Sequence, residues 1–140
     1  MPLTEDDSLI TEHAVLQSGP PSQLKLAAIA HFQIRRLQSE IQHRLYSPSQ
    51  KPHGPPSIEW INDVSRRLQA WRDSNPAATG FTSQQWLSLN YHHTRTLLHR
   101  PAPNAPQPDC QALREALSGA TGVIQAYKGM YREGRINYSQ

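Results

Sequence analysis

The sequence predicts an all-α fold with four main amphipathic helices joined by proline-rich loops. The prolines fall mostly into four clusters, at residues 19–22, 47–57, 74–80 and 100–108. Such clusters break helices, because proline lacks a backbone N–H and biases the preceding residue away from helical geometry. Between the clusters, apolar residues recur at spacings of three and four, as on one face of an α-helix. No segment shows the alternating β-branched pattern of a strand.

The first helix is expected over residues 22–46. Its apolar stripe consists of Ala27, Ala30, Ile34, Leu37, Ile41 and Leu45. The charged residues lie off this stripe, and Glu40 has helical spacing for an ion pair with Arg36 or Arg44.

The second helix is expected to begin after Pro56, with Ser57 as its N-cap, and to end at Asn75-Pro76. Its stripe consists of Trp60 or Ile61, Val64, Leu68 and Trp71.

The third helix is expected to begin where Thr82 and Gln85 have the spacing of a capping box, and to stop at Pro101. The residues that follow at helical spacing are Trp86, Leu87, Asn90, Tyr91, Thr94, Leu97 and Leu98.

The fourth helix is expected to begin near Asp109, whose carboxylate suits an N-cap and the positive end of the helix. Gly134 suits the position just after its end. One face is apolar and consists of Leu113, Ala116, Leu117, Ala120, Ile124, Tyr127 and Met130 or Tyr131.

The length of 140 residues suits one domain. Hydrophobic residues make up 36% of the chain, which is below the usual share, so we expect a modest core and some apolar surface that needs a partner. Residues 1–21 contain acids, prolines and a glycine and are predicted to be a flexible N-terminal tail, ahead of a helical domain over residues 22–140.

Charge and cysteine content narrow the function classes. The net charge of +3 is small and the basic residues are dispersed, which does not predict a nucleic-acid surface. Cys110 is the single cysteine, so the chain forms no internal disulfide and no cysteine-based zinc site, and we expect Cys110 to be a small buried side chain. The sequence shows no signal peptide and no apolar run of membrane-spanning length. We expect a soluble intracellular protein, nuclear or cytoplasmic, without membrane contact.

The segment LNYHHTRTLLHRP at residues 89–101 raises the question of a metal or catalytic site. On a helix, His92 and His99 lie roughly 10.5 Å apart along the axis, whereas two histidines that bind one metal are usually four residues apart. We therefore assign no metal ligand and no cofactor.

General acid–base chemistry at this segment would use Tyr91, His92 and His93, since a histidine that titrates near neutrality transfers protons readily. The third helix contains no carboxylate to orient either imidazole. We assign no catalytic residue and expect Tyr91 and one histidine to pack at a helix–helix contact.

Four segments, in order, carry a resemblance to a known family. They are HFQIRRLQSEIQHRLYS (31–47), IEWINDVSRRLQAWRDSNP (58–76), LSLNYHHTRTLLHRPAP (87–103) and CQALREALSGATGVIQAYKGMYREGRINYS (110–139). The third contains the pattern L-x-x-x-Y-H-x-x-x-x-L-L-x-R-P. Together they resemble the fungal-specific transcription factor domain, the middle regulatory region of fungal binuclear zinc-cluster regulators.

The resemblance implies part of a helical regulatory fold in which Tyr91 and His92 belong to a structural helix. The family binds DNA through six cysteines that hold two zinc ions, and a chain with one cysteine cannot build that cluster. The implied function is a non-catalytic regulatory and interaction module, resembling the effector-sensing part of a transcription factor, with no DNA binding of its own. The implied partners are a second copy in a dimer, another regulator protein, or a small-molecule ligand.

A second hypothesis remains open, namely a small-molecule-binding protein or an enzyme of fungal secondary metabolism recruited from this fold. The residues that would line its pocket are Trp60, Trp71, Trp86, Tyr91 and Arg95. His92 or His93 would be its proton-transfer group.

Overall fold

The computed structural model describes residues 23–48, 54–75, 84–132 and 134. Within these ranges the chain forms α1 (Gln23–Ile41), which continues into the π-helical turn η3 (Gln42–Tyr46), then α2 (Ile58–Ser74), α3 (Gln84–His99) and α4 (Cys110–Arg132). The predicted all-α class with four main helices is confirmed. The predicted tail over residues 1–21 and the capping box at Thr82 lie outside the described residues.

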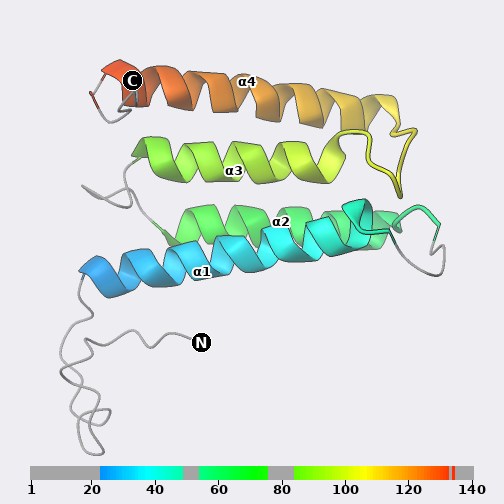
Figure 1. Ribbon diagram of the computed structural model, residues 1–140, viewed down its shortest axis with the longest axis horizontal. Coiled ribbons are helices and arrows are strands. Elements are labelled where there is room, and N and C mark those ends of the chain that lie inside the picture. Colours follow the sequence, from blue (N-terminus) through cyan, green and yellow to red (C-terminus); the bar gives the residue numbers. More distant parts are fainter. Residues whose placement is uncertain (1–22, 49–53, 76–83, 133, 135–140) are drawn as a thin grey trace, which may run out of the picture.

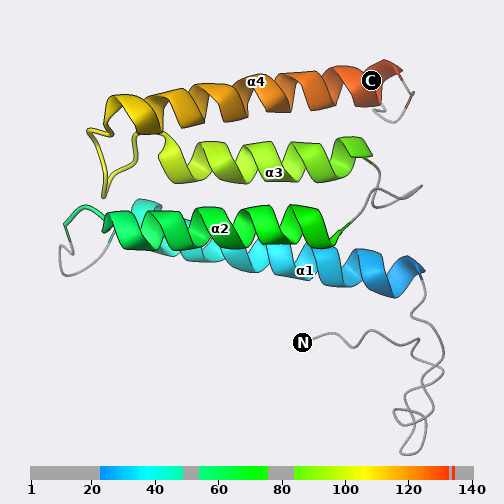
Figure 2. The same cartoon turned by 180° about the vertical axis from the view of Figure 1, so that it is seen from behind.

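The helix α3 lies in the middle of the stack (Figure 1). On one side it packs against α4, and on the other it packs against the pair α1 and α2. From behind, α2 lies in front of α1 (Figure 2). None of the described helices is both long and apolar enough to cross a membrane.

The core forms where α1, α2 and α3 meet. All six residues of the predicted α1 stripe are buried, together with Val64, Leu68 and Trp71 of α2 and Leu87, Leu97 and Leu98 of α3. Burial of each large aliphatic side chain stabilises the fold by about 1.5–3 kcal/mol. The 3.6-residue period therefore predicted the buried faces of these helices.

The predicted ion pairs of Glu40 with Arg36 or Arg44 are replaced by a contact between helices. Arg67 of α2 donates two hydrogen bonds to the Glu40 carboxylate, at 2.8 and 2.7 Å, and the indole Nε1 of Trp60 donates a third at 3.1 Å. Glu40 faces α2, and a bidentate guanidinium satisfies both carboxylate oxygens at once, which a single pair along α1 does not.

The predicted N-caps at Ser57 and Asp109 and the predicted glycine after the fourth helix are confirmed. The Ser57 hydroxyl accepts a hydrogen bond from the Trp60 backbone N–H at 3.2 Å, and the Asp109 carboxylate accepts one from Ala112 N–H at 2.8 Å. Gly134 has a φ of +69°, the left-handed geometry that glycine adopts just after a helix.

The apolar face predicted for the fourth helix is present, but most of it does not pack. Its large side chains are 45% to 69% exposed, namely Leu113, Leu117, Ile124, Tyr127 and Tyr131. Instead, α4 buries its small residues, namely Ala116, Gly119, Gly122 and Ala126. A side chain at position 119 would place its Cβ 2.9 Å from the carbonyl oxygen of His92, so α3 lies too close for anything larger. Cys110, which we expected to be buried, is exposed.

Candidate functional site

The histidines of α3 do not form a common site, because His92 and His99 lie two turns apart along the helix and His93 lies on another side. His92 lies at the contact with α4, where a Cβ on Gly122 would overlap its imidazole. His93 is exposed, and His99 is half-buried near the end of the helix. No three His, Cys, Asp or Glu side chains of the described ranges are grouped as ligands of one metal ion.

The surroundings of His92 favour the neutral imidazole. Burial lowers its pKa, and the nearby Arg72 and Arg95 guanidinium groups lower that pKa further. Its Nδ1 atom is buried and has no hydrogen-bond partner within the described residues. A proton on Nδ1 would therefore place an unpaired donor beside two cations, which is costly.

Tyr91 joins α3 to α2. Its hydroxyl donates a hydrogen bond to Gln69 Oε1 at 3.0 Å, and the guanidinium carbon of Arg72 lies 4.5 Å from the centre of its ring. Its ring also meets that of His92 edge to face, with centroids 5.1 Å apart. Tyr91 and His92 are thus contact residues between helices, whereas His93 points elsewhere.

The three tryptophans lie in two separate regions of the core. Trp71 donates from Nε1 to the Ala30 carbonyl at 3.0 Å, and its ring meets that of Trp86 at a centroid distance of 6.1 Å. Trp60 packs against the other cluster, which contains Ile41 and Val64. These side chains do not line one common cavity.

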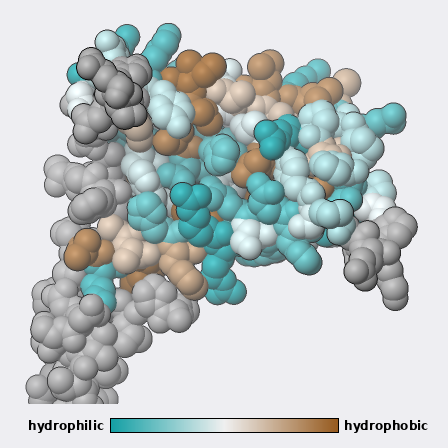
Figure 3. All heavy atoms as spheres, in the orientation of Figure 1, coloured by the Kyte–Doolittle hydropathy of each residue, from teal (hydrophilic) through white to brown (hydrophobic). Residues whose placement is uncertain are grey.

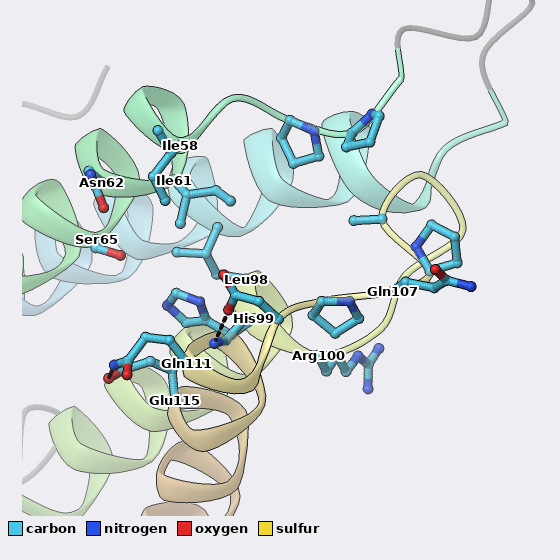
Figure 4. A pocket seen from close by; sticks show the side chains of 17 residues that line it. Ile58, Ile61, Asn62, Ser65, Leu98, His99, Arg100, Gln107, Gln111 and Glu115 are labelled. Atoms are coloured by element: carbon cyan, nitrogen blue, oxygen red, sulfur yellow. Dashed lines mark hydrogen bonds between the residues drawn. The ribbon is translucent and has the colours of Figure 1, made fainter.

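A cleft lies between the start of α2, the end of α3 and the start of α4 (Figure 4). It has a volume of about 670 Å³, within the range of small-molecule sites. Its apolar walls include Pro55, Pro56, Ile58, Ile61, Leu98, Pro106, Pro108 and Ala112, and its polar groups include Ser65, His99, Gln111 and Glu115. This cleft was not predicted, because three separate stretches of the chain, residues 55–65, 98–100 and 105–115, form it. The one available signal in the sequence is the pair of proline clusters that border the cleft.

The loop that walls the cleft is held by the end of the first helix. Asn104 donates from its backbone N–H to the Leu45 carbonyl at 3.0 Å and from its side chain to the Arg44 carbonyl at 2.9 Å. The Tyr46 hydroxyl donates to the Leu97 carbonyl at 2.8 Å. The Asn104 bonds thus fix the loop over residues 101–109 to the end of η3, and the Tyr46 bond fixes η3 to α3.

His99 is the titratable group best placed to meet a ligand in this cleft. Burial lowers its pKa, although the carboxylates of Glu115 and Asp109 act in the opposite direction. The Glu115 carboxylate itself accepts hydrogen bonds from Arg95 Nε at 2.7 Å and from Gln111 Nε2 at 3.2 Å. The neutral imidazole offers one donor and one acceptor. Two of the predicted ligand-binding residues, Tyr91 and Arg95, line a smaller cleft of about 150 Å³ that also includes His99.

The outward face of α4 is a second candidate site, formed by Leu113, Leu117, Ala120, Ile124, Tyr127 and Tyr131. We call these six residues the α4 seam. Hydrophobic side chains gather along α4 at the upper edge of the molecule (Figure 3). Contiguous exposed apolar surface of this kind is typical of an interaction site.

Comparison with known proteins finds two fungal regulators. The chain is 28% identical to the pyrimidine pathway regulatory protein 1 of Saccharomyces cerevisiae over 149 aligned residues, which cover 96% of this chain and 16% of that protein. It is 24% identical to the positive regulator of purine utilization of Emericella nidulans over 184 aligned residues, which cover 96% of this chain and 17% of that protein.

No protein-family model matches the chain, and no solved structure matches it significantly. The chain spans about a sixth of the length of the curated relatives it matches. By sequence, the chain is related to fungal regulatory proteins.

Proposed function

We propose that this chain is a non-catalytic regulatory module that acts through protein contact and resembles the effector-sensing part of a fungal transcription factor. The observation that supports this most is the α4 seam, whose large side chains are exposed although they lie on a well-formed helix. Exposure of such a face to water is unfavourable, and its burial against a partner lowers the free energy. The similarity to two fungal regulators supports the same function.

The proposed partners are a second copy of this chain, as in a symmetric dimer, or another regulator protein. The module would not bind DNA by itself, because its single cysteine cannot hold a zinc cluster. We expect a module with this role to be located in the nucleus.

The proposal is tested by comparing the chain with a seam variant, Leu117→Asp/Ile124→Asp, in sedimentation velocity and in co-purification from a fungal host. Leu24→Asp is the matched control, because Leu24 is 66% exposed on α1, away from α4. We expect the chain and the control to associate with a copy or another protein, and the seam variant to lose this association. A chain that stays monomeric and retains no protein in either assay would contradict the proposal.

The cleft beside His99 favours a second candidate function, the binding of a small and largely apolar molecule. Its volume of about 670 Å³ and its few converging polar groups are the reasons. The predicted ligand-binding residues Tyr91 and Arg95 would meet such a molecule only at the narrow inner end, where Ser65, Leu98, His99 and Glu115 line both clefts.

This second candidate is tested by an NMR titration with indole as a small apolar probe. We expect the resonances of Ser65 and His99 to shift, and the shifts to disappear in Ala112→Leu, whose larger side chain would narrow the cleft. Equal shifts in the chain and this variant would place the probe elsewhere and reject the cleft.

A further inference from the structure

We infer that the α4 seam binds a partner helix whose apolar stripe is flanked by acidic residues, in preference to a second copy of this chain. The inference rests on the proposed function and specifies the chemistry of its partner. Spacing, packing and charge support it.

The spacing of the α4 seam suits another helix. Its residues follow one another at intervals of four, three, four, three and four. Each pair of intervals of four and three spans seven residues, which is the heptad of a helix pair, in which apolar side chains interdigitate along one line. From Leu113 to Tyr131 the seam is about 27 Å long at 1.5 Å per residue, which is enough for three heptads of a partner. A narrow stripe of this length fits a helix better than a small molecule.

The helix α3 cannot cover this seam, because it already occupies the opposite side of α4. There α4 presents Gly119 and Gly122, and the backbone of α3 and the His92 ring fill the space above them. The two faces of α4 therefore have different roles. The small-residue face fixes α4 to its own fold, and the large-residue face remains for a partner.

The charged residues beside the α4 seam favour one kind of partner helix over another. Arg114 and Lys128 directly follow the seam residues Leu113 and Tyr127, so they flank the seam on one side, and both are exposed. The only carboxylate of α4 within the described residues is Glu115, which is half-buried and paired with Arg95. The exposed charge beside the seam is therefore positive.

A second copy would compensate this charge only in part. In an antiparallel pair of α4 helices, Arg114 of one copy would face Lys128 of the other, and the same repulsion would occur twice. In a parallel pair Lys128 would face the uncharged Val123 of the copy, and only Arg114 would meet a carboxylate, that of Asp109. A partner with Glu or Asp beside its apolar stripe would meet both cations with opposite charge.

The test uses the full chain and two synthetic helical peptides of about three heptads. Both peptides carry leucine at the two apolar positions of each heptad. They differ only at the positions that flank this leucine stripe, which are Glu in one peptide and Lys in the other. Binding is measured by fluorescence anisotropy at low and at physiological salt. We expect the Glu peptide to bind about tenfold more tightly than the Lys peptide, with a smaller ratio at higher salt.

Three variants make the test specific. Leu117→Asp/Ile124→Asp should abolish binding, and the matched control Leu24→Asp should retain it. Arg114→Glu/Lys128→Glu should reverse the preference between the peptides. All substituted positions are exposed, so circular dichroism should show unchanged helix content.

The outcomes also separate this inference from the proposed function. Equal binding of both peptides, or a preference unchanged by the charge reversal, would overturn the inference. A dimer that forms through the α4 seam would overturn it too, although the proposed function would stand. If neither peptide binds and no copy or other protein associates with the seam, both fail.

Discussion

The imidazole of His92 occupies the space that a side chain at Gly122 would need. A Cβ atom at position 122 would overlap the His92 ring. At the neighbouring contact, a Cβ on Gly119 would lie 2.9 Å from the His92 carbonyl oxygen. Because glycine occupies both positions, α4 approaches α3 closely on this side of the helix. Leu117 and Ile124 lie on the other side of α4 and are exposed.

Replacement of Gly122 by alanine should destabilise the fold. At an open helix position the change would stabilise by about 1 kcal/mol, because alanine is the better helix former. Here the overlap with His92 should cost about 1–3 kcal/mol. The double variant Gly122→Ala/His92→Ala should recover part of that loss, because the ring is gone. Urea unfolding measures both, and a double variant no better than the sum of the single losses would contradict this packing.

A leucine in the core and a leucine on the surface should respond very differently to truncation. Leu97 is 5% exposed in the core, so Leu97→Ala should lower the free energy of unfolding by about 2–5 kcal/mol. Leu117 is 69% exposed, so Leu117→Ala should change it by less than about 0.5 kcal/mol in the isolated chain. Thermal or urea unfolding measures both. A large loss for Leu117→Ala would mean that the α4 seam is already covered.

The ion pair between Glu40 and Arg67 should make a modest contribution that is lost in acid. Both side chains are more than a third exposed, so we expect about 0.5–1 kcal/mol from a double-mutant cycle of Glu40→Gln and Arg67→Met. The Arg67 guanidinium holds the pKa of Glu40 below its ordinary value of 4.5. The Glu40 carboxylate therefore binds a proton more readily in the unfolded chain than in the folded chain. The contribution is present above pH 4.5 and lost as the pH falls through the pKa of the folded state. A coupling energy unchanged at pH 3 would contradict this.

The stability of the chain should fall as the pH drops below the ordinary histidine pKa of 6.5. Burial lowers the pKa of His92 and of His99 below that value in the folded state. The unfolded chain then binds more protons, so the free energy of unfolding is highest above pH 6.5 and declines below it. His92→Gln should make this decline shallower in urea unfolding at a series of pH values. His43→Gln, at an exposed residue of η3, is the matched control, and an equal change in both variants would rule out His92 as a source.

Local patterns were enough to predict the helices and their ends. The six apolar residues from Ala27 to Leu45 recur at helical spacing, and all are buried. Ser57 and Asp109 cap their helices as expected, because an N-cap needs only a side-chain oxygen beside the free N–H groups of the first turn. These features depend on neighbours within a few residues, so the sequence alone determined them.

The tertiary structure decided which helix faces meet. The apolar period of α4 indicated its large-residue face, but α3 packs on the small-residue face, because close approach of two backbones excludes bulky side chains. The partner of Glu40 and the cleft beside His99 join residues far apart in the chain, and no local spacing encodes such distances. Periodicity reveals that a helix has an apolar face, whereas what covers that face depends on the shape and position of every other helix.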